Sequence, residues 1–373
     1  MSRPPTGASP ATPAASASPP APRQAPGLRG CPRPLTDAYD TALLDLDGVV
    51  YLGGTPIPGA AAALTRAASG MSLAYVTNNA SRTPRAIGEQ LAGMGVPVQP
   101  GSVITSAQAA ARILSERLPR GSSVLVVGGT GLRLAVRERG LRPVTTARDH
   151  PAAVVQGYHP TIGYPLLAEG ALAVAAGALF VASNADVTLP SARGRQPGNG
   201  ALVQVIAVAT GRDPIVAGKP EPSMHKEMML RTGAQRPLIV GDRLDTDIEG
   251  ANRTGTDSLL VLTGVSRPSD VVLAPPRQRP SYLAADLSGL LGPHPLPSGG
   301  GGEPLRCNGW QARWAGRGAS GDGAAGAGAG TRIELTGSGD RIDALRLLCA
   351  ACWARDGVTA DVVADALRAA GLD

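Results

Sequence analysis

The segment from Thr41 to Tyr51, TALLDLDGVVY, constrains the fold of this chain more than any other. It opens with a short apolar run, Ala42 to Leu44, which is typical of a strand buried on both faces of a sheet. Two carboxylates follow at a spacing of two, Asp45 and Asp47, and an extended chain projects them to one side. Gly48 then allows a sharp turn. Acids at the end of a buried strand indicate an α/β protein with a site at that edge, the alternative being a plain polar turn.

Apolar strand-like segments and longer helix-like segments alternate along most of the chain. We expect strands at residues 42–44, 73–77, 103–106, 124–127, 153–156, 179–182, 238–240 and 258–262. We expect helices at residues 60–68, 84–94, 107–118, 132–139 and 166–176. This alternation predicts a doubly wound (Rossmann-like) α/β fold, in which helices cover both faces of a mostly parallel sheet.

The two ends of the chain differ in composition from the middle. Residues 1–38 are dominated by Pro, Ala, Ser and Thr, which predicts a disordered tail; a wrongly chosen start codon and a functional tail both remain open explanations. Residues 293–330 are rich in Gly and Pro, which predicts a linker with little order. Residues 331–373 regain a pattern of one strand and two helices, and we expect a small α/β appendage there.

Composition excludes several classes of protein. Of the 35 basic residues only two are lysines, Lys219 and Lys226, so the net charge of +6 reflects an arginine-rich codon bias. Aromatic residues make up 3% of the chain and no run of five basic residues occurs, so we expect no nucleic-acid partner. The four cysteines form no disulfide framework for this length. Without an 18-residue apolar span or a signal sequence, we expect a cytoplasmic protein that does not bind membranes.

Four polar stretches should converge if the sheet is parallel. They are Asp45 with Asp47, Thr77 with Asn78, Lys219, and the run from Asp242 to Asp247. Three of them follow expected strands, and the carboxyl ends of parallel strands share one edge of a sheet. Clustered carboxylates repel one another unless they hold a hard cation such as Mg²⁺. The cation and the lysine would then form a cradle for a phosphoryl group.

The motifs DLDGVVY, VTNNASR, AGKP and GDRLDTDIEGA, in this order, resemble the four motifs of the haloacid dehalogenase (HAD) superfamily. More narrowly, the chain resembles the p-nitrophenyl-phosphatase-like subfamily, whose large cap lies between the second and third motifs. The resemblance covers residues 39–292. It implies a core built from residues 39–106 and 214–292 and an α/β cap domain over residues 107–213.

The resemblance also implies catalytic roles for three residues. Asp45 would be the nucleophile that forms an aspartyl-phosphate. Asp47 would give a proton to the leaving alcohol and later take one from the attacking water. Lys219 would pair with the nucleophile and the phosphate. We expect Mg²⁺ and Lys219 to lower the pKa of Asp45 and neighbouring carboxylates to raise that of Asp47.

Binding roles follow from the same resemblance. Asp45 and Asp242, together with the backbone carbonyl of Asp47, would hold Mg²⁺, and Asp247 would support the ion and the lysine without direct contact. Thr77, Asn78 and Asn79 would bind the phosphoryl oxygens.

The cap would close over the site and choose the substrate. Asn184, Asp186 and the loop 193–200 are candidates to contact the alcohol portion, although these residue types are equally typical of plain turns.

The expected activity is hydrolysis of a small phosphate monoester. The PGNG loop and the C-terminal extension resemble a branch of the subfamily that acts on glycerol 3-phosphate, so this is the first candidate substrate. Phosphoglycolate, pyridoxal phosphate and sugar phosphates remain open. So does a non-catalytic regulator that binds a phosphometabolite, although a pure binder gains nothing from a proton donor. The sequence leaves open whether the chain forms a homodimer.

One further motif, Gly128-Gly129-Thr130-Gly131, follows a strand and opens a helix, as a dinucleotide-binding loop does. Leu134 stands where the third glycine of that fingerprint belongs, so we do not expect nucleotide binding there.

Overall fold

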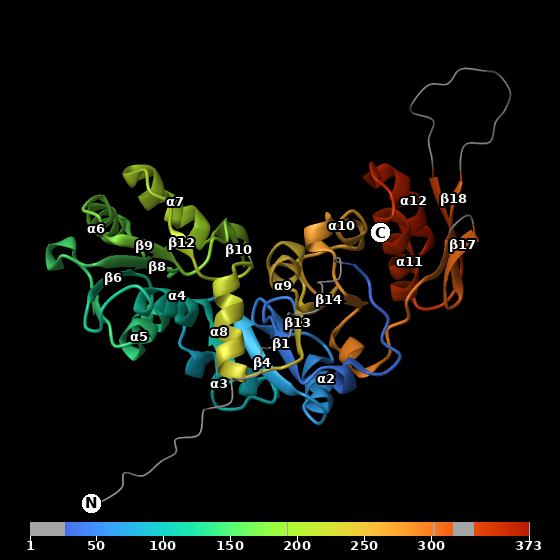
Figure 1. Ribbon diagram of the computed structural model, residues 1–373, viewed down its shortest axis with the longest axis horizontal. Coiled ribbons are helices and arrows are strands. Elements are labelled where there is room, and N and C mark those ends of the chain that lie inside the picture. Colours follow the sequence, from blue (N-terminus) through green and yellow to red (C-terminus); the bar gives the residue numbers. More distant parts are fainter. Residues whose placement is uncertain (1–26, 192, 301–302, 316–331, 373) are drawn as a thin grey trace, which may run out of the picture.

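The computed structural model describes residues 27–372, except residues 192, 301–302 and 316–331 (Figure 1). Three regions can be followed by colour in Figure 1: the cap in green on the left, the core in the middle, and the C-terminal unit in red on the right. The core and the cap each contain a parallel sheet, whereas the sheet of the C-terminal unit is antiparallel. The predicted α/β class is confirmed.

The described core contains a parallel sheet of six strands in the order β15-β14-β13-β1-β4-β5. In chain order these strands are β1 (Thr41–Leu44), β4 (Ser72–Thr77), β5 (Val103–Thr105), β13 (Pro237–Gly241), β14 (Asp257–Val261) and β15 (Tyr282–Ala284). Every residue of β1 is buried, because it lies inside the sheet and both faces are covered.

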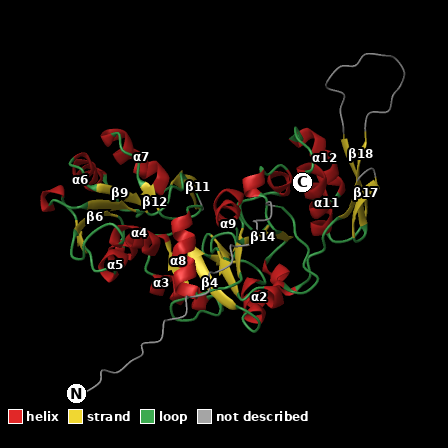
Figure 2. Ribbon diagram, in the orientation of Figure 1, coloured by secondary structure: helices red, strands yellow, loops and turns green. Residues whose placement is uncertain are grey.

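Helices cover both faces of the core sheet, as Figure 2 shows. Leu44 packs in the apolar cluster of one face and the adjacent Leu43 in the cluster of the other, because successive side chains of a strand alternate. The first face carries α1 (Leu35–Ala38), α2 (Ala60–Ala67) and α3 (Pro84–Gly93), and the second carries α4 (Ser106–Ser115), α8 (Pro222–Thr232) and α9 (Glu249–Thr254).

The cap holds a second parallel sheet in the order β12-β9-β8-β6-β7. Its strands are β6 (Ser123–Val127), β7 (Arg142–Val144), β8 (Ala153–Gln156), β9 (Leu179–Ala182) and β12 (Ile215–Val216). Its helices are α5 (Thr130–Glu138), α6 (Tyr164–Ala175) and α7 (Asn199–Thr210), and an antiparallel hairpin joins β10 (Thr188–Ser191) to β11 (Gly194–Pro197). Strand β12 lies beyond the expected cap boundary at residue 213.

The C-terminal unit is an antiparallel sheet in the order β16-β17-β18-β19 with two helices packed on it. Its elements are β16 (Ser298–Gly300), β17 (Glu303–Cys307), β18 (Trp310–Ala315), β19 (Arg332–Gly337), α11 (Arg341–Trp353) and α12 (Ala360–Ala369). Helix α11 also packs against α10 (Pro268–Val272) of the core, so one apolar cluster joins the two. The expected strand and both helices after residue 331 are present.

Two expectations about order are wrong. Within the tail predicted over residues 1–38, the described part, 27–38, is folded: Leu35 is fully buried and the backbone of Cys31 pairs with that of His294. Residues 1–26 lie outside the described part of the chain. Within the linker predicted over residues 293–330, strands β16 to β18 are formed, because Trp310 and Ala312 alternate with exposed residues and bury one side of the sheet. Residues 316–331 of that linker are not described.

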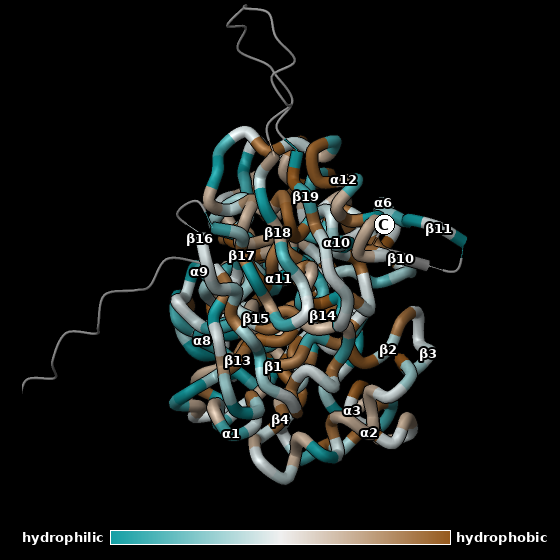
Figure 3. The backbone as a smooth tube through the Cα atoms, turned by 90° about the vertical axis from the view of Figure 1, so that its right-hand side faces the viewer, coloured by the Kyte–Doolittle hydropathy of each residue, from teal (hydrophilic) through white to brown (hydrophobic). Residues whose placement is uncertain are grey.

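Apolar stretches gather in the interior beside β14 and β15, whereas α9 and β11 are hydrophilic (Figure 3). Among the residues described, no helix combines the length and the apolar character needed to cross a membrane.

Candidate active site

The predicted convergence of polar residues at one edge of the core sheet is present. Strands β1 and β13 are parallel neighbours, and Asp45 and Asp242 follow their last residues directly. Thr77 ends β4 on the other side of β1. Because all three strands point the same way, their carboxyl ends place these side chains at the same edge.

Lys219 lies between two of the carboxylates. Its Nζ atom is 2.7 Å from Oδ1 of Asp45 and 2.8 Å from Oδ1 of Asp247, and only 8% of its side chain is exposed. Burial alone would lower the pKa of Lys219, but the carboxylates of Asp247 and Asp45 outweigh burial and raise it. Lys219 is therefore a fixed positive charge against Asp45.

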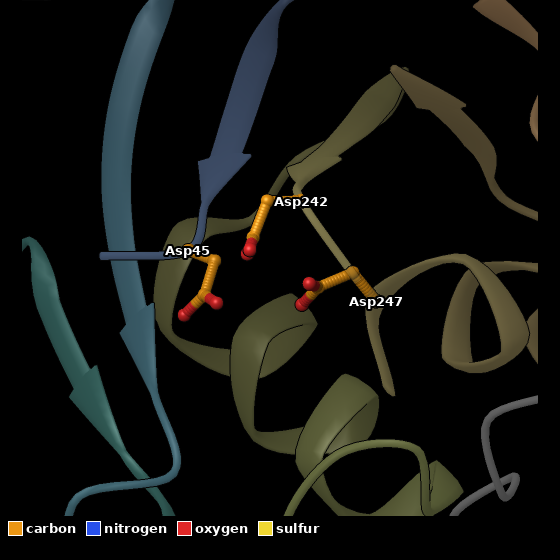
Figure 4. Close-up of side chains that lie close together, drawn as sticks. All are labelled: Asp45, Asp242 and Asp247. Atoms are coloured by element: carbon orange, nitrogen blue, oxygen red, sulfur yellow. The ribbon is translucent and has the colours of Figure 1, made fainter. Parts of the chain in front are cut away.

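The carboxylates of Asp45, Asp242 and Asp247 lie close enough to share one cation, with oxygens within 4.8 Å of one another. Figure 4 shows the three side chains directed toward a common space. Burial, then the charges of Asp247 and Asp45, raise the pKa of Asp242 to about 8, and burial raises the pKa of Asp247 to about 6. Three acids thus share one lysine, and this excess of negative charge is what a divalent cation would relieve.

Asp242 itself carries the clearest sign of a missing partner. Its side chain is completely buried, and Oδ1 has no hydrogen-bond partner among the described residues. Its other oxygen accepts the backbone N–H of Val265 at 2.7 Å. A buried carboxylate oxygen without a donor is costly, so the donor set fits a hard cation such as Mg²⁺.

Two glycines allow this close packing around Asp242. A Cβ atom at Gly48 would lie 2.4 Å from Oδ2 of Asp242, and one at Gly264 would lie 2.0 Å from the same oxygen. Gly48 also has a φ of +84°, in the left-handed region. The glycine that follows Asp47 is therefore required both for the turn and for the space that Asp242 occupies.

Asp47 stands apart from the three clustered acids. Its side chain is exposed to the cleft, yet the surrounding walls limit its hydration and raise its pKa, while Lys219 opposes the rise. The expected direction is present, but burial causes it rather than neighbouring carboxylates. For Asp45 burial also raises the pKa, with Lys219 opposing, so among the protein groups alone the direction is opposite to the expected lowering.

The segment after β4 is tied tightly to its surroundings. Thr77 is buried, and its Oγ1 accepts the backbone N–H of Asn79. The side-chain amide of Asn78 accepts the backbone N–H of Lys219 at 2.9 Å and donates to the carbonyl of Lys219 and to Asp186. Asn78 therefore fixes the backbone of Lys219 with its side chain.

The two cap residues predicted to contact substrate, Asn184 and Asp186, both line the cleft but differ in burial. Asn184 is buried: its Nδ2 donates to the Asn78 carbonyl at 2.7 Å and its Oδ1 accepts the N–H of Asp186. Asn184 thus joins the cap to the core. The carboxylate of Asp186 lines the cleft, where burial raises its pKa and Arg243 opposes the rise.

A cleft of about 700 Å³ lies between the sheet edge and the cap, with Asp45, Asp47 and Lys219 among its lining residues. Three residues of the predicted loop 193–200 line the cleft: Arg195, Gln196 and Asn199. The Oδ1 atom of Asn199 is buried and has no hydrogen-bond partner in the described chain. Tyr158, Thr188 and Leu189 also line the cleft without having been predicted, and so do Arg243 and Asp245, for which no individual role was predicted. Arg243 and Asp245 stood inside the fourth motif, whereas Tyr158 carried no signal in the sequence.

Comparison with known proteins agrees with this geometry. The haloacid dehalogenase-like hydrolase family matches residues 42–142, and a related HAD hydrolase family matches residues 216–290. The D-glycerol 3-phosphate phosphatase of Mycobacterium tuberculosis is 47% identical over 258 residues, which are 69% of this chain and 72% of that protein. This chain belongs to the haloacid dehalogenase-like hydrolases.

Other members of these HAD-like hydrolases extend the comparison. The acid sugar phosphatase of Staphylococcus aureus is 40% identical over 236 residues, 62% of this chain and 90% of that protein. The crystal structure of glycerol phosphate phosphatase from M. tuberculosis in complex with calcium is 38% identical, with a TM-score of 0.78, and covers 91% of this chain and 99% of that one. The structural match therefore reaches beyond the core and cap of the HAD-like hydrolase into the C-terminal unit.

Proposed function

We propose that this phosphatase hydrolyses small phosphate monoesters through an aspartyl-phosphate on Asp45, with glycerol 3-phosphate as its first candidate substrate. The observation that carries the proposal is the placement of Asp45 in the cleft, 2.7 Å from the ammonium of Lys219 and beside two buried acids. The named relatives are phosphatases, and the crystal structure of the M. tuberculosis glycerol phosphate phosphatase matches 91% of this chain.

Mg²⁺ is the cofactor that the donor set supports. The carboxylates of Asp45 and Asp242 and the backbone carbonyl of Asp47 would hold it, and Asp247 would support the ion and Lys219 without contacting the ion. When bound, the ion would neutralise the negative charge that develops on the phosphoryl oxygens during the transfer. The M. tuberculosis glycerol phosphate phosphatase has been crystallised both with calcium and with magnesium.

In the first step a carboxylate oxygen of Asp45 forms a bond to phosphorus while the bond from phosphorus to the alcohol oxygen breaks. Asp47 gives its proton to the departing alkoxide, which leaves as the alcohol. The raised pKa of Asp47 suits this task, because the group must hold a proton near neutral pH. Lys219 compensates the charge on Asp45 and on the phosphoryl group.

In the second step water attacks the phosphorus of the aspartyl-phosphate. Asp47, now ionised, takes a proton from the water, and the bond between phosphorus and the Asp45 oxygen breaks. Inorganic phosphate leaves, and both acids return to their starting states. Thr77, Asn78 and Asn79 would orient the phosphoryl oxygens, with Asn78 contributing its backbone N–H because its side chain holds Lys219.

The choice of substrate would rest on the cap. Asp186, Asn199 and Arg195 line the cleft and offer acceptors and a cation to the part of the substrate beyond the phosphate. Asp186 and Asn199 can both accept hydrogen bonds from hydroxyl groups of the substrate. This favours a polyol phosphate over the phosphate of an aromatic aldehyde such as pyridoxal phosphate. Similarity to both a glycerol phosphate phosphatase and a sugar phosphatase supports the same preference.

The test is a panel of phosphate esters, ranked by kcat/KM with Mg²⁺ present. We expect release of phosphate from p-nitrophenyl phosphate, and the highest kcat/KM for glycerol 3-phosphate over phosphoglycolate, pyridoxal phosphate and sugar phosphates. Asp45→Asn should lower kcat by roughly 10³-fold or more. A wild-type protein that releases phosphate from no ester in the panel would contradict the proposal.

A further inference from the structure

The glycine-rich segment Gly128 to Gly131 has no role in the mechanism above and does not resemble a complete nucleotide loop. In the structure it ends β6 and begins α5 of the cap. Gly129 and Gly131 face a core segment, Ala80 to Arg82, which directly follows the proposed phosphate-binding residues. The motif therefore lies where the cap meets the loop after β4.

Gly131 makes the closest approach. Its backbone N–H, in the first turn of α5, donates to the carbonyl of Ser81 at 3.0 Å. A Cβ atom at Gly131 would lie 2.2 Å from the carbonyl oxygen of Arg82 and 2.8 Å from that of Ala80. Both obstacles are backbone atoms, so any side chain here must displace the core segment.

Gly129 and Gly157 extend the same contact. A Cβ atom at Gly129 would lie 2.9 Å from the carbonyl of Ser81 and 2.7 Å from the ring of His159, and one at Gly157 would lie 3.0 Å from the Cβ of Ala80. Three glycines from two cap loops thus pack closely against one short core segment. None of them has a φ in the left-handed region, so close packing is what requires glycine at these positions.

The segment they press on is continuous with the phosphate-binding residues. The side-chain oxygen of Asn79 accepts the backbone N–H groups of Ser81 at 2.9 Å and of Arg82 at 3.2 Å. The carbonyl of Asn78 is held from the core by Ser106 and from the cap by Asn184. A displacement at Arg82 would therefore be transmitted to Asn79 and Asn78 through this single turn.

We infer that Gly131, with Gly129, positions the phosphate-binding loop from the cap side, so that the cap sets phosphate affinity as well as access. The inference rests on the proposed function, because it takes residues 77–79 as the phosphate-binding residues. Gly131 is a positioning residue: it acts through Ser81 and Arg82 and contacts no reacting atom.

The test compares two glycine substitutions in the full-length protein with Mg²⁺ present. Gly131→Ala should weaken binding of inorganic phosphate about tenfold or more, as expected when a hydrogen bond to a charged group is lost. The Mg²⁺ concentration for half-maximal activity should stay unchanged, because the segment contacts none of the clustered acids. Isothermal titration with inorganic phosphate and a Mg²⁺ titration of activity measure the two effects.

Gly163→Ala is the matched control. Gly163 precedes the first turn of a cap helix, α6, as Gly129 precedes that of α5, but a Cβ atom there would meet only Pro165 at 3.7 Å. We expect wild-type phosphate affinity for this variant. Equal weakening in Gly163→Ala and Gly131→Ala would overturn the inference, because the effect would then be general to the cap.

Gly129→Ala covers the case in which Gly131→Ala does not fold. Its nearest obstacle is the His159 ring, which can rotate, so this variant should fold and weaken phosphate binding by a smaller factor. Unchanged phosphate affinity in a folded Gly131→Ala protein, or in Gly129→Ala if the first does not fold, would overturn the inference. A wild type that binds phosphate but hydrolyses no ester would overturn the proposed function alone.

Discussion

Two of the clusters of buried charge in the described part of the chain are balanced differently. At the active site Asp45, Asp242 and Asp247 share the single cation of Lys219. Where the C-terminal unit meets the core, Asp343 pairs with the guanidinium of Arg346, and both side chains are less than 10% exposed.

The second cluster is also complete in its hydrogen bonds. Arg346 donates to the carbonyl of Leu283 in β15 at 2.7 Å and lies 3.2 Å from Nδ1 of His294, while Asn308 donates to the second oxygen of Asp343. In the first cluster Asp242 keeps an oxygen without a partner in the described chain. Removing one partner of the balanced cluster would leave a buried charge uncompensated, whereas a bound cation would relieve the repulsion within the unbalanced cluster.

The largest expected effect on stability comes from breaking the balanced cluster. Arg346→Ala leaves Asp343 buried without its partner and should lower the free energy of unfolding by about 3–5 kcal/mol. The kcat/KM of the folded fraction should stay unchanged, because the cluster does not line the cleft. Urea unfolding with a parallel assay measures both.

Arg332→Ala is the control for this prediction. Arg332 pairs with Glu334 on the C-terminal sheet, but 71% of its side chain is exposed, so its removal should cost less than about 1 kcal/mol. Similar losses in Arg332→Ala and Arg346→Ala would show that burial does not separate the two pairs.

Removing a charge from the unbalanced cluster should have the opposite sign. The pKa of Asp242 is raised to about 8, so the folded protein loses stability as the pH rises from about 4 through 8. Asp242→Asn lacks this loss, so at pH 8 in EDTA its free energy of unfolding should exceed that of the wild type by about a few kcal/mol at most, and its Tm should be higher. Added Mg²⁺ should raise the Tm of the wild type alone.

Thermal unfolding with and without Mg²⁺ decides this point. The variant should also be inactive, so stability and activity move in opposite directions. An Asp242→Asn protein that is less stable than the wild type in EDTA would mean that the three acids are already satisfied without a cation.

The smallest effect is a pH dependence of the balanced cluster. Burial lowers the pKa of His294, the hydrogen bond to the Gly289 carbonyl opposes this and the adjacent Arg346 adds to it, so the folded protein disfavours the charged imidazole. Below about pH 6.5 the unfolded chain takes up a proton that the folded chain does not, so stability falls by up to about 1 kcal/mol per pH unit. His294→Gln should flatten this part of the profile between pH 7.5 and 5.5, as followed by Tm, and an unchanged slope would contradict the prediction.

The edge of the sheet that carries the site could be predicted, because each acid and the strand that positions it are adjacent in the sequence. Asp45 and Asp242 stand directly after short apolar strands, and parallel strands bring their ends together whatever the loops do. The pKa pattern was harder to predict, because it depends on how deeply each acid is buried. Sequence spacing does not reveal that Asp242 is fully enclosed by Gly48 and Gly264.

The parts that were missed depend on contacts between distant segments. Strands β17 and β18 stood in a Gly- and Pro-rich region, and their alternation became meaningful only with α11 packed against them. Leu35 is fully buried, but it lies within residues 1–38, whose composition predicted a disordered tail. Tyr158 lines the cleft from the cap, where neither a motif nor a period marks it.

The most direct test of the account is a search for the phosphorylated enzyme. In Asp47→Asn, p-nitrophenyl phosphate should still phosphorylate the enzyme, because nitrophenolate leaves without a proton, while hydrolysis of the intermediate should slow. Rapid acid quench followed by mass spectrometry of the peptide that contains Asp45 should then show a phosphoryl group on that residue. Nitrophenol release at many turnovers with no phosphoryl group on Asp45, in this variant or in the wild type, would contradict the account.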